Sequence, residues 1–223
     1  MRRGLRGFVL AVLLSVAASF SAFAEETLSG TEAFHRAEQY YFGRDGYVAD
    51  PDKFLHWLRI AAEKGDADGQ FNLGYTYFEG DGVPRDAAEG IKWYRLAAEQ
   101  GHLAAQYNLG HAYYDGIGVT QDFVEAAHWY RRAADGGAAD AAYNLGKMYF
   151  DGTGVEYDPA KALDLFKRAA TAGQGDAAYN VGYMYEHGIG VPRDRQKAIE
   201  WLELARDFGE ASAGDYLEKL GAD

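Results

Sequence analysis

The sequence predicts an all-α protein, a solenoid of stacked helix pairs, and three observations carry this prediction. First, the 36-residue stretch 67–102 recurs without insertion or deletion at 103–138, 139–174 and 175–210. Second, apolar residues within each copy fall three or four residues apart, which is helical spacing. Third, glycines that suit tight turns recur at the same step. A fixed period of this size is typical of arrays in which each unit covers the hydrophobic face of its neighbour.

The first 24 residues have the pattern of a secretory signal peptide. A basic start with three arginines is followed by an apolar run from Phe8 and by the sequence AFA, a small-residue cleavage site that ends at Ala24. A membrane anchor is the weaker interpretation, because serines interrupt the run and it is short for a span. We therefore expect a Sec-type signal peptide at 1–24, cleaved after Ala24, a periplasmic or secreted product, and no stable membrane insertion.

Composition narrows the classes of partner. The chain has no cysteine, which excludes disulfides, thiol chemistry and the cysteine anchor of a bacterial lipoprotein. Its net charge of −12 becomes −15 when the three arginines of the leader are removed. An acidic surplus disfavours nucleic acid and anionic membranes as partners. It favours a cationic partner, or it serves solubility alone.

The segment before the first full repeat divides into two parts. Residues 25–30 are a polar lead-in, and residues 31–66 form a degenerate repeat in which Trp57 stands one period before Trp93. Ala37 and Glu38 replace the leucine and glycine of the later copies. We expect this atypical unit to be the N-terminal cap, because the end of an array has no neighbour to cover it.

The first helix of each repeat is expected over 67–79 and its equivalents. Leu73 and Tyr77 lie on one face of this helix, and Gly80 suits the left-handed residue that ends it. A second glycine within the helix has no side chain and so allows a close approach of helices; its four copies are Gly74, Gly110, Gly146 and Gly182.

The second helix of each repeat is expected to begin after a capping aspartate, and Gly101 and its equivalents end it. The caps of the full repeats are Asp86, Asp122, Asp158 and Asp194. Glu89 and Glu125 follow two of them at the spacing of reciprocal capping boxes. All four tryptophans share one position on this helix, predicted to face the first helix: Trp57, Trp93, Trp129 and Trp201, with Leu165 in the remaining copy.

Residues 211–223 retain part of a further first helix. Ala213 and Leu217 are in register with the repeats, while Glu218 replaces the packing glycine. We predict a C-terminal capping helix; the edge of an oligomer contact is the alternative.

These residues resemble a known family. The pattern A-x-x-x-L-G-x-x-Y-x-x-G-x-G-V-x-x-D, followed by A-x-x-W-Y-x-x-A-A-x-x-G, is similar to the Sel1-like repeat, a relative of the tetratricopeptide repeat. The resemblance covers 67–210 closely and 31–66 loosely. It implies a right-handed α-α superhelix used mostly as a scaffold or adaptor for other proteins. Cysteine-rich members with a claimed penicillin-binding activity differ from this cysteine-free chain.

No motif points to a reaction, a metal or a cofactor. The glycine loops lack the lysine and the preceding strand of a phosphate-binding loop, so turn geometry explains them. The six histidines include no pair at the spacing of a zinc motif, and no nucleophile context occurs. We expect a protein that is not an enzyme; a β-lactamase-like hydrolase is the least favoured alternative.

The resemblance implies a concave groove lined by first-helix side chains. Carried onto this register, the groove residues are Phe71, Tyr75, Phe78, Tyr107, His111, Tyr114, Tyr143, Lys147, Phe150, Tyr179 and Tyr183. Acids stand beside them, among them Asp68, Asp115, Asp140 and Asp176. Rigid aromatic rings rimmed by carboxylates suit a peptide with cationic and apolar groups. Stacking on sugar rings is the alternative.

Two kinds of position differ within this set. The position of Tyr75 reads tyrosine, histidine, lysine and tyrosine along the array and is the better candidate for specificity. The position of Phe71 is aromatic in every copy, which favours packing between repeats. An asparagine also recurs, at Asn72, Asn108, Asn144 and Asn180. Hydrogen bonds between helices are the favoured role for it, and capture of a peptide carboxylate is the other.

The sequence thus predicts an exported, non-catalytic scaffold that binds a protein or peptide partner, cationic in character, in its concave groove. Binding of polysaccharide or peptidoglycan by the aromatic face is the alternative.

Overall fold

The computed structural model describes residues 27–221, so the predicted signal peptide, residues 25 and 26 and the last two residues lie outside it. The described part contains eleven α-helices and no strand. The helices are α2 (Gly30–Phe42), α3 (Pro51–Glu63), α4 (Ala67–Glu79), α5 (Ala87–Glu99), α6 (Leu103–Asp115), α7 (Phe123–Asp135), α8 (Ala139–Asp151), α9 (Pro159–Thr171), α10 (Gly175–His187), α11 (Arg195–Asp207) and α12 (Ala211–Lys219).

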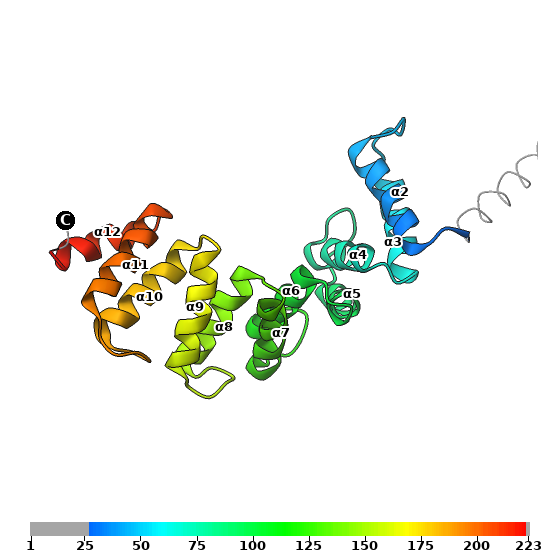
Figure 1. Ribbon diagram of the computed structural model, residues 1–223. Helices are drawn as coiled ribbons and strands as arrows, with labels where there is room; N and C mark the ends of the chain where they lie inside the picture. Colours follow the sequence, from blue (N-terminus) through cyan, green and yellow to red (C-terminus); the bar gives the residue numbers. More distant parts are fainter. Residues whose placement is uncertain (1–26, 222–223) are drawn as a thin grey trace, which may run out of the picture.

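The helices follow one another along an open array. Each packs mainly against its neighbours in the sequence, most closely within the pairs α2–α3, α4–α5, α6–α7, α8–α9 and α10–α11. Figure 1 shows the colours running from blue to red along the array without doubling back, so the two ends lie far apart. The predicted fold class, an all-α solenoid of helix pairs, is confirmed. None of the described helices is long and apolar enough to cross a membrane.

A glycine in the left-handed region follows both helices of a repeat. Gly80 has a φ of 81° and stops α4 in the left-handed region. After α5, Gly101 has a φ of 95°, its N–H donates to the carbonyl of Ala98, and the N–H of His102 donates to that of Ala97. This pair of bonds is the Schellman arrangement, which satisfies carbonyls left free at a helix end.

Aspartates cap the second helices, but the expected capping boxes do not form. The carboxylate of Asp86 accepts the N–H of Glu89 at 3.0 Å. A reciprocal box would need the Glu89 carboxylate to accept the N–H of Asp86, and that N–H donates instead to the carbonyl of Tyr77 at 2.8 Å. The N–H of Asp122 likewise donates to a carbonyl, that of Tyr113. The prediction of boxes was therefore wrong at both sites, because the returning chain already supplies an acceptor.

The glycine within each first helix lies against a large side chain of the second helix. An added Cβ would lie between 2.5 and 2.9 Å from that side chain, closer than packed carbon atoms come. The pairs are Gly74 with Tyr94, Gly110 with Tyr130, Gly146 with Phe166 and Gly182 with Leu202. These second-helix residues, each directly after the tryptophan position, form the centre of the core.

The tryptophans lie where one repeat meets the next. Trp93 packs on a cluster that contains Leu73 of its own repeat and Trp57 and Leu58 of the preceding one. Trp129 belongs to a cluster with Leu109 and with residues of α5. At the C-terminal end, α12 buries Ala213 and Leu217 against the array.

Candidate functional site

The candidate groove is formed by side chains of α4, α6, α8 and α10. The position predicted to set specificity is exposed in every repeat: Tyr75, His111, Lys147 and Tyr183 all lie open to solvent. Tyr75 is 48% exposed and Tyr183 is 37% exposed. Their side chains are therefore free to meet a partner.

The aromatic position of Phe71 is half-buried and packs against the second helix. Tyr107 lies 5.8 Å from Tyr130 between ring centroids, and Tyr143 lies 5.8 Å from Phe166. In the last repeat, Tyr179 meets Tyr216 of α12 instead, at 5.9 Å. These rings thus pack partly in the core and remain partly exposed.

The third groove position also packs against neighbouring rings. Phe78 lies 5.7 Å from Tyr94, Phe150 lies 6.5 Å from Phe166, and Tyr114 contacts Phe123 at 5.2 Å. Tyr114 remains 36% exposed. The groove face therefore alternates between core rings and exposed side chains.

Three adjoining depressions bring seven of the predicted groove residues together. One of about 410 Å³ is lined by Tyr107, Tyr143 and Asn144 with acids. One of about 200 Å³ is lined by Tyr143, Lys147, Phe150 and Tyr183. One of about 150 Å³ is lined by His111, Tyr114, Asn144 and Lys147. Shared walls make them one surface, which we call the α6–α10 groove. Phe71, Tyr75, Phe78 and Tyr179 line none of the three.

The largest of the three depressions of the α6–α10 groove is acidic. Asp140, Asp176 and Glu210 line it, and the side-chain amide of Gln174 bonds to Asp140. A hydrogen bond with Glu210 raises the pKa of Asp176, and burial adds to this effect. The same bond lowers the pKa of Glu210. The carboxyl group of Asp176 therefore keeps its proton to a higher pH than a free aspartate does, and Glu210 loses its proton first.

Lys147 brings the opposite charge to the middle of the groove. Its ammonium lies 5.7 Å from the centroid of the Tyr143 ring. It also lowers the pKa of Asp176, although less than Glu210 raises it. The α6–α10 groove thus has an acidic end beside a single exposed lysine.

Glu210 and Gln174 were not predicted for the site. Each is the residue before a first helix, at the register of Asp66 and His102. Residues at this register point toward the neighbouring repeat, so the 36-residue spacing was a signal that could have identified both.

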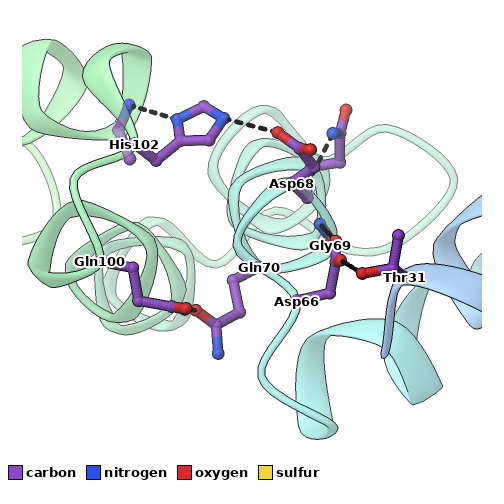
Figure 2. Close-up of polar contacts among 9 residues, drawn as sticks. Thr31, Asp66, Asp68, Gly69, Gln70, Gln100 and His102 are labelled. Atoms are coloured by element: carbon purple, nitrogen blue, oxygen red, sulfur yellow. Dashed lines mark hydrogen bonds and ion pairs between the residues drawn. The ribbon is translucent and has the colours of Figure 1, made fainter. Parts of the chain in front are cut away.

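Figure 2 shows how this register works at the α4–α6 joint, where His102 caps α6. Its Nδ1 accepts the N–H of Ala105 at 3.2 Å, and its Nε2 lies 3.2 Å from the carboxylate of Asp68. The ring of Phe71 stacks on the imidazole at 4.4 Å. Asp68, expected beside the groove, is thus engaged by the adjacent repeat.

The recurring asparagines have two roles. Asn72 donates to the carbonyl of Asp68 in its own helix at 2.8 Å. Asn108, Asn144 and Asn180 bond to tyrosine hydroxyls of the preceding repeat, which moderates the rise in pKa that burial gives Tyr94, Tyr107, Tyr130 and Tyr143. Hydrogen bonding between helices, the favoured interpretation, describes these three and not Asn72.

Ion pairs on the groove face do not form a metal centre. His111 lies 3.3 Å from Asp115, one helical turn away. Among the residues that the structure describes, no group of three or more histidine, cysteine, aspartate or glutamate side chains could hold a metal ion.

Comparisons with known proteins agree with this architecture. The model of the Sel1 repeat family matches residues 34–66, 67–102, 103–137, 139–174 and 175–207. A protective antigen of uropathogenic Escherichia coli with an SLR fold is 35% identical, with a TM-score of 0.80, over 86% of this chain and 42% of that protein. A Sel1 repeat protein from Oxalobacter formigenes is 34% identical, with a TM-score of 0.72, over 83% of this chain and 73% of that one. This chain therefore spans less than half the length of the E. coli antigen. A search of curated proteins finds no match.

Proposed function

Because the chain belongs to the Sel1 repeat family, whose members are generally protein-interaction scaffolds, we propose that it is an exported, non-catalytic scaffold that binds a protein or peptide in the α6–α10 groove. The observation that carries this proposal is the convergence of exposed and varied side chains. His111, Lys147 and Tyr183 are exposed, differ between repeats, and line adjoining depressions.

The chemistry of the groove favours an extended peptide with a positive group. The carboxylates of Asp140, Asp176 and Glu210 line the acidic end of this groove, where a lysine or arginine side chain would meet opposite charge. Half-buried rings of Tyr107 and Tyr143 line the same depression. Aromatic side chains held in place by core packing lose little conformational entropy when a ligand binds them.

A crosslinking pull-down from the envelope fraction of the native cells tests the proposal. The bait is compared with the triple variant His111→Ala/Lys147→Ala/Tyr183→Ala, which removes three exposed side chains of the groove. A matched control carries Leu96→Ala, Val124→Ala and Tyr157→Ala, three substitutions of exposed residues outside the groove. We expect a partner to be captured by the wild type and the control and lost from the folded groove variant. A partner that all three retain would place the binding surface elsewhere.

Polysaccharide binding is the second candidate, and the exposed rings of Tyr75, Tyr114 and Tyr183 favour it. The salt dependence of binding distinguishes a cationic peptide from a polysaccharide. Binding of a cationic peptide should weaken as ionic strength rises, because charges beyond the Debye length are screened. Stacking of sugars on tyrosine rings should change little between low and high salt.

A further inference from the structure

A separate depression of about 540 Å³ lies between α7, α8 and α9. Leu145 and Leu165 form its floor, Tyr149 forms a wall, and Arg131, Asp135, Asp158, Lys161 and Asp164 surround it. It shares no lining residue with the depressions of the α6–α10 groove.

This depression lies at the one repeat that lacks the tryptophan. Position 165 is leucine where the other copies have Trp57, Trp93, Trp129 and Trp201. Leucine is shorter than tryptophan and lacks its flat bicyclic ring. A tryptophan at position 165 would therefore extend its indole from the floor into the space of the depression.

The other repeats show where that indole would lie. Trp93 packs on the cluster that contains Leu73, and Tyr77 packs on the same cluster. Trp129 shares a cluster with Leu109, on which Tyr113 also packs. Trp201 packs on the cluster that contains Val181 and Tyr185. The equivalents of these pairs in the third full repeat are Leu145 and Tyr149, the residues that line the depression. The space beside Leu165 is therefore lined by the equivalents of residues that share a cluster with an indole in the other repeats.

The rim supplies polar partners suited to a tryptophan. Trp93 donates its indole N–H to the carboxylate of Glu89 at 3.1 Å, but the residue equivalent to Glu89 here is Lys161. Asp164 is exposed on the rim, so its carboxylate is available to accept a hydrogen bond there. Lys161 forms an ion pair with Asp158 at 2.9 Å, and its ammonium lies 5.3 Å from the centre of the Tyr149 ring. Asp135 is engaged in a similar way, 3.8 Å from Arg168, so Asp164 is the rim acid best placed to meet a basic residue beside the incoming ring.

We propose that this depression is a binding site for the indole ring of a tryptophan side chain presented by a partner polypeptide. The partner's ring completes the register that Trp57, Trp93, Trp129 and Trp201 occupy within the chain. Tryptophan anchors contribute strongly to protein interfaces because they bury a large rigid surface and retain one hydrogen-bond donor. The site does not depend on the α6–α10 groove, so each proposal can fail without the other.

Nuclear magnetic resonance of the purified protein, with labelled leucine and valine methyl groups, tests the proposal. The probe is N-acetyl-L-tryptophanamide, which presents the side chain on a peptide-like backbone. Free indole and N-acetyl-L-leucinamide are the comparisons. An aromatic ring shifts the signals of methyl groups beneath its face upfield. We expect saturable upfield shifts at Leu145 and Leu165 with N-acetyl-L-tryptophanamide and none with N-acetyl-L-leucinamide.

The substitution Leu165→Trp should fill the depression with an indole of the chain itself. It should therefore abolish the shift that the probe causes at Leu145 and raise the melting temperature. If that variant does not fold, Leu165→Phe blocks the same space with a smaller ring. The proposal is overturned if the tryptophan probe causes no shift at these methyls, or if the leucine probe causes an equal one. Shifts with free indole but not with N-acetyl-L-tryptophanamide would also overturn the proposal, because the site would then take a small molecule and not a side chain of a partner. A Leu145 shift that survives in the folded Leu165→Trp protein would place the ring elsewhere.

Discussion

The guanidinium of Arg131 on α7 donates a hydrogen bond of 2.9 Å to the hydroxyl of Tyr149 on α8, 18 residues further along the chain. The same bond recurs at every internal joint: Arg59 with Tyr77, Arg95 with Tyr113 and Lys167 with Tyr185. Each cation also belongs to the second helix of one repeat, and each tyrosine to the first helix of the next. The series stops at the last repeat, where Glu203 and Gly221 occupy the two positions.

We predict that this bond couples adjacent repeats. Tyr149→Phe keeps the ring and removes the acceptor, so the free energy of unfolding should fall by about 0.5–1.5 kcal/mol. A double-mutant cycle with Arg131→Met, followed by urea denaturation, measures the coupling between the two residues. Tyr157→Phe, at a tyrosine that is 59% exposed, is the control and should change stability little. Strictly additive effects of the two substitutions would show that the bond contributes nothing.

The glycines within the first helices should resist even the smallest substitution. Gly110→Ala places a Cβ 2.5 Å from Tyr130. Overpacking of this kind costs about 1–3 kcal/mol, which outweighs the gain of about 1 kcal/mol that alanine brings to a helix. Gly214→Ala on α12 is the matched control, because an added Cβ there meets no atom within 4 Å. Denaturant melts should show a loss for the first variant and a small gain for the second. Equal gains in stability for the two variants would mean that α6 and α7 can move apart to accept the added Cβ without cost.

Much of the fold could be predicted because the array is built from local signals. Asp86 precedes the second helix, Gly80 follows the first, and both act through their own backbone neighbourhood. The capping boxes failed because the competing acceptor, the carbonyl of Tyr77, comes from the preceding helix. The bond from Arg131 to Tyr149 was missed for a similar reason: it joins two repeats, whereas periodicity shows only that each residue recurs.

The candidate site could be predicted in part. Residues at the same position of each repeat were expected to share one face of the array. His111 and Lys147 are such a pair, and they line one depression. The repeat register could not show which residues of the segments between helices reach that face. Glu210 enters the acidic end because the chain turns there between α11 and α12, which requires the position of both helices.

The start of α8 lacks a side-chain cap, and adding one should stabilise the array. Ala138 occupies the capping position without a hydrogen bond, whereas the carboxylate of Asp66 at the same register accepts the N–H of Gly69 at 2.8 Å. Ala138→Ser should raise the free energy of unfolding by about 0.5–1 kcal/mol. Ala172→Ser makes the same chemical change at an exposed position after α9 and should bring no gain. Thermal melts that rank the two variants equally would contradict this account of the helix start.

The hydrogen bond between Asp176 and Glu210 predicts a pH-dependent stability. The pKa of Asp176 is raised in the folded protein, so its ionisation near neutral pH costs more when the chain is folded than when it is unfolded. This cost is absent below the unfolded pKa of about 3.9, where the carboxyl keeps its proton in both states. Asp176→Asn keeps a donor toward Glu210 and removes the like charge. We therefore expect it to stabilise the protein at pH 7 by a few tenths of a kcal/mol, roughly the scale of exposed charge pairs.

The pH profile separates this pair from the general effect of removing one acid from a chain of net charge −12. Glu203→Gln, at an exposed position of α11, makes the same change in charge away from the pair and is the matched control. Urea denaturation at pH 7 and at pH 3.5 should show the advantage of Asp176→Asn over Glu203→Gln at the higher pH only. A constant difference at both values would mean that Glu210 does not raise the pKa of Asp176, and the acidic end would then present two independent carboxylates to a cationic partner.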